Sequence, residues 1–175
     1  FPYFVPAYNP ANKLRICGFQ GYREGLQKIF SSQMESPYFP VSLREMPGHI
    51  TFEELTDMEF NIGKVHVQAA FANHPGICVG YRLNTSAGSV AFFPDNEPHQ
   101  RLRGQHGSQL STEAIAYARR LDEKLIDFIR DVDVLIIDSQ YDDTEYQKHI
   151  GWGHGCLDDV VTLALFAGVK KLFLF

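Results

Sequence analysis

Two residues, His74 and Asp95, carry side chains that could bind a metal ion, and each lies at the end of an apolar segment. The residues between them, 77–93, have the pattern of two strands joined by a short turn. If Ala87-Gly88 forms that turn, residue 80 lies opposite Asp95, and His74 lies just beyond. An imidazole and a carboxylate at one sheet edge are ligand types that hold zinc or iron in hydrolytic sites. Taken singly, each residue would be interpreted as a surface side chain beside a turn.

A second pair of candidate residues, Asp138 and His154, lies nearer the C-terminus. Asp138 directly follows the apolar run 132–137, which is typical of a strand buried on both faces. Ligands of open sheets bind at the carboxyl ends of such strands. His154 lies in the segment 151–155, where three glycines in five residues indicate that the backbone approaches something closely. A charged imidazole is unfavourable at the start of a helix, so a functional role for His154 is favoured over a capping role.

The elements that must position these residues follow from periodicity. Strands are predicted at 14–19, 50–55, 64–71, 77–85, 89–93, 132–137 and 169–175, and helices at 22–34, 112–129 and 157–167. Residues 96–110 are polar and are predicted to form a mobile loop that could cover a site as a lid. Hairpins followed by strand–helix–strand units predict an α/β fold with helices on the outside of a mixed sheet.

Composition narrows the class of protein. The 175 residues have a net charge of −5 and no run of Lys or Arg, which argues against a broad nucleic-acid footprint. Cys17, Cys78 and Cys156 are far apart in apolar settings, so we expect buried thiols in a reducing, cytoplasmic compartment. No segment has the length and apolarity of a membrane span or the pattern of a signal peptide. Exposed positions are expected for His49, His66, His99 and His106, and His149 carries no functional signal.

Four motifs, taken in order, resemble those of the metallo-β-lactamase fold hydrolases, in particular the branch near tRNase Z and bacterial phosphodiesterase-like members. The motifs are Asn73-His74-Pro75-Gly76, Phe92-Phe93-Pro94-Asp95-Asn96-Glu97, the run 133–141 that contains Asp138, and Gly153-His154-Gly155. The resemblance covers essentially the whole chain. It departs from the branch pattern after His154, where Gly-Cys replaces Ser-Thr.

The resemblance implies an αββα sandwich over residues 1–175, as a single but partial domain. His74 is then a terminal ligand and Asp95 a bridge between two divalent metal ions, zinc or alternatively manganese or iron. Asp138 and His154 are implied to be catalytic and to assist the leaving group. The family's His-x-His-x-Asp-His motif is absent, and its last ligand histidine would fall past Phe175. Because both chain ends are abrupt, we expect a fragment of a complete enzyme.

The activity implied by this resemblance is that of a phosphodiesterase that uses a hydroxide bound by two metals. A small phosphodiester or nucleotide is favoured as substrate over RNA, because the net charge is acidic and no RNA-gripping insertion is evident. A homodimer without membrane association is expected, and the 175 residues alone are expected to be inactive. Two alternatives stay open: a binding or sensory module that has lost catalysis, and a thioester or lactone hydrolase on the same fold.

Overall fold

The computed structural model describes residues 1–19, 24–102 and 111–175, which form two compact units. The first unit is Phe1–Asp57 and the second is Met58–Phe175. The expectation of a single domain over residues 1–175 stays a prediction.

The first unit is built on a parallel pair of strands, β1 (Lys13–Phe19) and β2 (His49–Leu55), in which Lys13 pairs with His49. Both strands confirm the sequence prediction to within one residue. The other elements of this unit are the short helices η1 (Val5–Tyr8), α1 (Leu26–Gln33) and η2 (Leu43–Glu45). Helix α1 begins later than predicted, although part of the predicted first turn lies outside the described residues. A small apolar core contains Ala7, Met34 and Met46.

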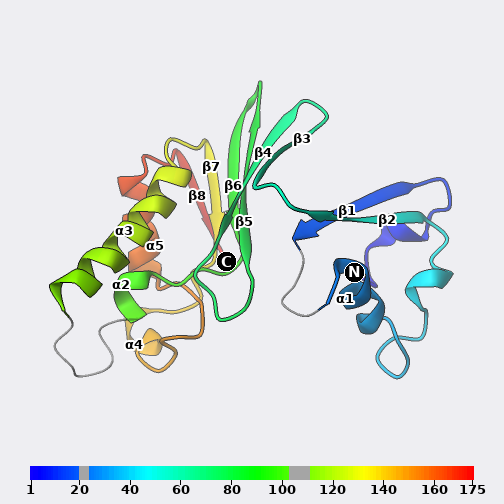
Figure 1. Cartoon of the computed structure of the whole chain (residues 1–175), viewed down its shortest axis with the longest axis horizontal. Coiled ribbons are helices and arrows are strands. Elements are labelled where there is room, and N and C mark those ends of the chain that lie inside the picture. The colour runs from blue at the N-terminus through cyan, green and yellow to red at the C-terminus, as the bar shows by residue number, and fades with distance from the viewer. Residues whose placement is uncertain (20–23, 103–110) are drawn as a thin grey trace. The chain divides into compact units, whose positions relative to one another are not determined.

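The second unit is built on a mixed sheet of six strands with the order β3-β4-β5-β6-β7-β8 (Figure 1). The strands are β3 (Glu59–Ile62), β4 (Val65–Phe71), β5 (Val79–Thr85), β6 (Gly88–Phe93), β7 (Val134–Ile137) and β8 (Lys171–Leu174). Strands β3 to β6 pair antiparallel, whereas β6, β7 and β8 pair parallel. This arrangement confirms the predicted α/β class.

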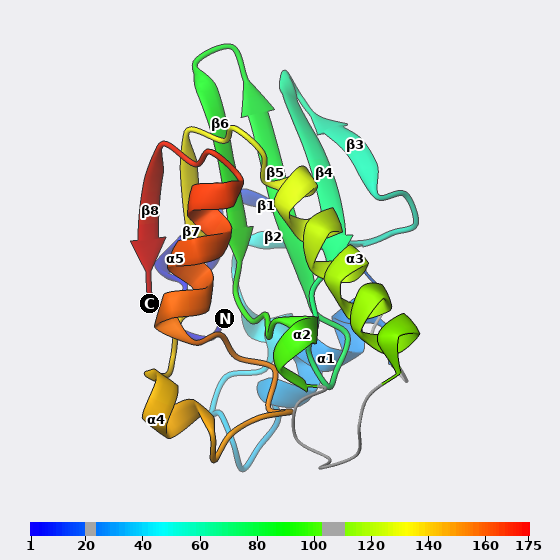
Figure 2. The same cartoon turned by 90° about the vertical axis from the view of Figure 1, so that its left-hand side faces the viewer.

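Two long helices cover one face of this sheet (Figure 2). Helix α3 (Thr112–Phe128) connects β6 to β7, and helix α5 (Leu157–Phe166) connects β7 to β8. Apolar side chains from both helices and from the strands fill the space between them: Ala91, Phe93, Ile129, Val132, Leu135, Ile137, Val160, Ala164 and Ala167. The alternation along β6 therefore directs Ala91 and Phe93 into the core and leaves Val90 and Phe92 on the opposite face, more than a third exposed.

The hairpin of β5 and β6 has a register that differs from the prediction by two residues. Thr85 pairs with Gly88 and Tyr81 with Phe92, so the turn is Ser86-Ala87 and Asp95 does not lie opposite residue 80. The Thr85 side chain explains the shift: its Oγ1 accepts from the Ala87 N–H at 3.1 Å and donates to the Gly88 carbonyl at 2.9 Å. Local hydrogen bonds thus fix the turn one position earlier.

Two polar side chains fix the C-terminal end of helix α3 and the segment that precedes this helix. The guanidinium of Arg82, on β5, donates from Nη1 to the carbonyls of Phe128 and Arg130 at 2.8 and 2.9 Å, where α3 ends. The carboxylate of Asp122, on α3, accepts from the N–H groups of His99 and Gln100 at 2.8 and 3.1 Å. These bonds stabilise the start of a short helix, α2 (His99–Leu102), inside the segment predicted to be a loop. The rest of that predicted lid, with His106, lies outside the described residues.

Strand β8 is an edge strand of the six-stranded sheet, since no other strand in the described residues pairs with its outer side. Its Phe173 is 56% exposed, and Phe175 just beyond it is 58% exposed. The ring of Phe175 stacks on that of Phe92 across the face away from the helices, with centroids 6.0 Å apart. Among the described helices, none is long and apolar enough to cross a membrane.

Candidate active site

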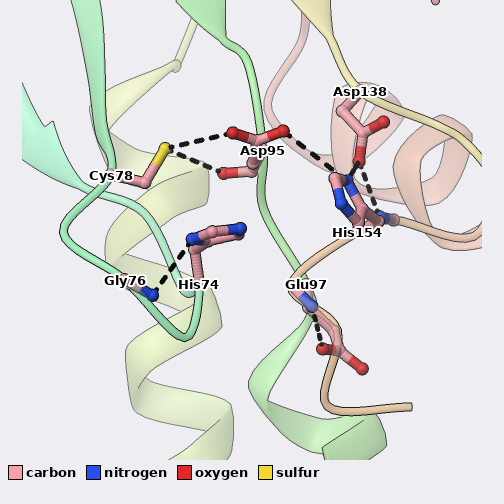
Figure 3. A network of polar contacts seen from close by, with 9 residues as sticks. His74, Gly76, Cys78, Asp95, Glu97, Asp138 and His154 are labelled. Atoms are coloured by element: carbon pink, nitrogen blue, oxygen red, sulfur yellow. Dashed lines mark hydrogen bonds and ion pairs between the residues drawn. The ribbon is translucent and has the colours of Figure 1, made fainter. Parts of the chain in front are cut away.

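The four candidate residues come together at one edge of the six-stranded sheet. Strands β4, β6 and β7 run in the same direction, so their carboxyl ends lie at the same edge. His74 follows β4, Asp95 follows β6 and Asp138 follows β7, and His154 reaches this edge from the loop before α5 (Figure 3). The direction of the strands, and not the predicted hairpin register, brings His74 near Asp95.

His74 is held in a loop that is bonded to the loop of Asp95. Its Nδ1 accepts from the Gly76 N–H at 3.2 Å, which leaves Nε2 available to a ligand. The neighbouring Asn73 donates its backbone N–H to Asn96 Oδ1 at 3.0 Å and its Nδ2 to the Glu97 carbonyl at 2.6 Å. The Glu97 N–H donates in turn to the Asn73 carbonyl at 3.0 Å. The two candidate metal-binding loops are therefore one hydrogen-bonded unit.

Asp95 lies between Cys78 and His154 (Figure 3). One carboxylate oxygen is 3.7 Å from Cys78 Sγ, and the other is 3.6 Å from His154 Nδ1. Burial raises the pKa of the Cys78 thiol, and the negative charge of Asp95 raises it further. Cys78 therefore faces Asp95 as a neutral thiol. The Asp95 side chain stays 35% exposed and is open to a ligand.

His154 and Asp138 form the tightest pair of the site. Asp138 Oδ2 lies 3.1 Å from His154 Nδ1 and accepts from the Gly155 N–H at 3.0 Å. Burial raises the pKa of the Asp138 carboxyl, against the lowering effects of the Gly155 N–H and His154, and the charge of Asp95 raises it further. The same Nδ1 lies 3.6 Å from Asp95 Oδ1, so both carboxylates lie beside this nitrogen of the ring. The His74 and His154 rings are 5.9 Å apart in an edge-on arrangement.

Glu97 is a site-organising residue that the sequence did not reveal. It is 1% exposed, and its carboxylate accepts from the Tyr146 hydroxyl at 2.6 Å and from the N–H groups of Gly151 and Gly153, each at 2.8 Å. It therefore holds the loop that carries His154, while its backbone is bonded to the loop of His74. Its partners Gly151 and Gly153 are 54 and 56 positions away, so no local pattern could have shown this role.

The predicted close approach of the glycine-rich loop is confirmed at Gly153. Its φ is +92°, and a Cβ there would collide with His74 Cδ2 and lie 2.6 Å from Pro75 Cδ. The loop backbone thus packs directly on the imidazole of His74. Glycine at position 153 is required both by the backbone conformation and by this contact.

The remaining histidines and cysteines show mixed outcomes. His49 is exposed as predicted, whereas His66 and His99 are half-buried, so the prediction of exposed positions is wrong for these two. His66 Nε2 is 2.7 Å from Glu59 Oε1. Of the cysteines, only Cys156 is buried, whereas Cys17 and Cys78 are half-buried, so the prediction of three buried thiols is wrong for two of them. All three are free.

His149 has neighbours that the sequence did not indicate. Its ring stacks on Tyr141 with centroids 4.4 Å apart and an interplanar angle of 5°. The ring of Trp152, which is 59% exposed, meets it edge-on at 4.7 Å. His149 therefore belongs to an aromatic row beside the site.

The side chains at this edge fit a divalent metal ion in type, because an imidazole nitrogen and a carboxylate are both usual ligands. They are few in number: within residues 1–19, 24–102 and 111–175, no group of three or more His, Cys, Asp or Glu side chains is placed to hold one ion. His74 and Asp95 are thus two donors of suitable chemistry. Their roles as terminal ligand and bridge stay predictions.

Comparison with known proteins identifies the fold. No protein-family model matches the chain, and no curated protein matches it significantly. Solved structures do match: the metallo-β-lactamase fold protein YhfI from Bacillus subtilis (TM-score 0.60, 16% identity, 93% of this chain) and the short form of human tRNase Z (0.60, 16%, 91%). A diphosphatase from the PhnP family matches with a TM-score of 0.52 at 13% identity over 91% of this chain.

The chain therefore has a metallo-β-lactamase fold, as the sequence resemblance predicts. It spans 50%, 58% and 45% of the lengths of these three structures, respectively, so it shares about half of each. This agrees with the expectation that the fold is incomplete. At such low identity the likeness establishes the fold, and the chemistry has to be argued from the site.

Proposed function

We propose that the protein is a metal-dependent hydrolase that cleaves phosphodiester bonds. The observation that supports this most directly is the His154–Asp138 pair, whose imidazole lies 3.6 Å from Asp95 at the carboxyl edge of the sheet. A tRNase Z and a diphosphatase are among the structures that share the fold, which favours a phosphoryl substrate.

His74 and Asp95 would hold divalent metal, with Asp95 shared between two ions, and further ligands would have to come from outside the described residues. Zinc is favoured by the imidazole and carboxylate donors, and manganese and iron are alternatives. When bound, such ions lower the pKa of water and neutralise charge on phosphoryl oxygens. The bonds between the Asn73, Asn96 and Glu97 segments keep His74 and Asp95 in place before any ion binds.

His154 would act on the leaving group. Its Nδ1–H is directed at the Asp138 carboxylate, which fixes the orientation of the ring and stabilises the imidazolium. Nε2 can then donate a proton to the departing alkoxide, as a general acid. Asp138 acts through His154, because it is 4% exposed and its Oδ2 is already bonded to His154 and the Gly155 N–H.

The substrate, the location and the oligomeric state are proposals as well. A small phosphodiester or nucleotide is favoured over RNA by the net charge of −5 and the absence of a run of Lys or Arg in the sequence. The expected cytoplasmic location and the expected homodimer stay predictions.

The test is an assay of the full-length protein against bis(p-nitrophenyl) phosphate with added zinc or manganese. We expect Asp95→Ala to abolish turnover and to lower the metal content measured by elemental analysis. Asp57→Ala is the matched control, because Asp57 is an exposed carboxylate outside the second unit. Activity that survives in Asp95→Ala would exclude the bridging role. Hydrolysis of a thioester or lactone in place of the phosphodiester would support the alternative hydrolase, and a metal-free, inactive protein would support a binding module.

A further inference from the structure

Trp152 is a large aromatic side chain presented to solvent on a loop whose backbone is fixed. It is the single tryptophan of the sequence and is 59% exposed. On either side of it, the N–H groups of Gly151 and Gly153 donate to the buried Glu97 carboxylate at 2.8 Å, and its own N–H donates to the His149 carbonyl at 3.0 Å. An exposed indole on an anchored backbone can accept a flat partner at little cost in conformational entropy.

A row of rings connects Trp152 with the proposed general acid. Trp152 meets His149 edge-on at 4.7 Å, and His149 stacks flat on Tyr141 at 4.4 Å. Tyr141 meets the His154 ring edge-on at 6.2 Å. The position of the His149 ring is also fixed by its Nδ1, which is hydrogen-bonded to the Glu145 carbonyl at 2.8 Å. An aromatic surface therefore extends from the His154 ring to the exposed indole of Trp152.

We propose that Trp152 is a stacking surface for the nucleobase of a small nucleotide substrate; this inference rests on the proposed phosphodiesterase function. Trp152 and His154 are two residues apart, so their Cα atoms are separated by at most about 7.6 Å. We place the phosphate of the nucleotide at His154, its base at the indole and its sugar along the row of rings between them. Every nucleobase has a π-face, and stacking on an aromatic side chain is a general mode of base recognition.

The charges around the loop favour a single nucleotide over a long nucleic acid. The segment 141–155 carries Asp142, Asp143 and Glu145 against one lysine, Lys148. A polynucleotide needs several cations along its phosphate backbone, and this loop does not offer them. A single base can be held by stacking alone, with its phosphate bound at the site.

The single tryptophan allows a direct test by fluorescence. We expect adenosine 5′-monophosphate to quench Trp152 emission in the 175-residue chain at lower concentration than it quenches free N-acetyltryptophanamide. Ribose 5-phosphate should have no such effect. Equal effects of the two phosphates, or no quenching beyond that of the free amino-acid derivative, would overturn the inference.

Variants test the same point without relying on quenching. Equilibrium dialysis of adenosine 5′-monophosphate should show about a 10-fold weaker affinity for Trp152→Ala and nearly full affinity for Trp152→Phe. The control is Phe166→Ala, which removes an aromatic ring that is 72% exposed on α5. An equal loss in Trp152→Ala and Phe166→Ala would reject the stacking surface.

The outcome can be separated from that of the proposed function. In the full-length protein, a normal rate on bis(p-nitrophenyl) phosphate with no effect of Trp152→Ala on nucleotide affinity would reject the stacking surface alone. Nucleotide binding that depends on Trp152 without any phosphodiesterase activity would reject the proposed reaction and keep the binding surface. Binding of long single-stranded RNA in preference to the mononucleotide would reject the proposed occupant.

Discussion

At the scale of single residues, His154 has contacts that separate a catalytic role from a ligand role. Its Nδ1 lies 3.1 Å from Asp138 and 3.6 Å from Asp95, so removal of the ring leaves His74 and the Asp95 carboxylate intact. We expect His154→Ala to lower kcat at least 100-fold, a loss typical of a missing general acid, while metal content is kept. The measurement is a rate assay paired with elemental analysis of the full-length protein.

His66→Ala is the matched control for this change, since His66 lies on β4 in an exposed ion pair with Glu59. It should leave both rate and metal content unchanged. If His154→Ala loses metal instead of rate alone, His154 is a ligand, and the assignment of the general acid is wrong.

The residue types of the site were readable from the sequence, but the contacts between them were not. Three of them, His74, Asp95 and Asp138, follow the end of an apolar segment, and His154 lies within a glycine-rich segment; both patterns are local signals. Glu97 gives no local signal, because its function depends on N–H groups of residues 151 and 153 that only the folded chain brings near. His149 was missed for the same reason, since its partners Tyr141 and Trp152 are defined by ring packing.

At the scale of elements, Glu97 controls the loop that precedes α5. We expect Glu97→Gln to destabilise the protein by about 1–3 kcal/mol, because an amide presents one acceptor where the buried carboxylate presents two. Hydrogen exchange should show faster exchange of the Gly151 and Gly153 amides in the variant. Turnover of the Glu97→Gln variant should fall because the loop that carries His154 is less well held, while its metal content stays unchanged.

Glu113→Gln serves as the control for Glu97→Gln, since Glu113 is exposed in the first turn of α3. Equal exchange rates at Gly151 and Gly153 in the wild type and in Glu97→Gln would show that the loop is held by other contacts.

The starts of the three parallel strands are joined through one carboxylate, Asp133. Lys170 donates to it at 2.6 Å, and Ser89 donates from its N–H at 2.7 Å. These contacts lower the pKa of Asp133 from its ordinary 3.8 to about 2. The hydrogen bond from Lys170 has the largest effect, and the hydrogen bonds from Ser89 come next. Because the folded-state pKa is depressed, the stabilisation is present above pH 3.8 and is lost as the pH falls through about 2.

Urea unfolding between pH 2 and pH 6 should therefore distinguish Asp133→Asn from the wild type. The difference in unfolding free energy should be constant at the upper end of this range and should shrink toward the lower end. Lys170→Met should move the wild-type loss to higher pH, because the main lowering contact is removed. A difference that does not change with pH would mean that Asp133 stabilises the strands without its charge.

The hairpin of β5 and β6 shows that its strands can be predicted from the sequence but their register cannot. The strands β5 and β6 were found from their composition, but the register was wrong by two residues because the Thr85 hydroxyl bonds fix the turn at Ser86-Ala87. The site still forms, since β4, β6 and β7 share a direction whatever the turn. The direction of the strands is therefore a safer basis for placing the site than the geometry of the turn.

At the scale of the molecule, β8 lies at an edge of the six-stranded sheet, and no strand within residues 1–19, 24–102 and 111–175 pairs with its outer side. Edge strands with exposed apolar side chains pair readily with other chains. We expect the 175-residue chain to self-associate at high concentration and Phe173→Lys to reduce this association. Sedimentation velocity over a range of concentrations would measure it, with Phe166→Lys, on α5, as the control. Equal behaviour of the two variants would place the contact away from β8.

The contact between Gly153 and His74 has a genetic consequence. Position 153 has no functional group, yet even one added carbon would collide with the imidazole of His74. A survey of all substitutions under selection for activity should find it as intolerant as the ionisable residues of the site. Glycine at position 153 would then be invariant although it takes no part in the chemistry, and from sequence alone it has the pattern of an ordinary turn glycine.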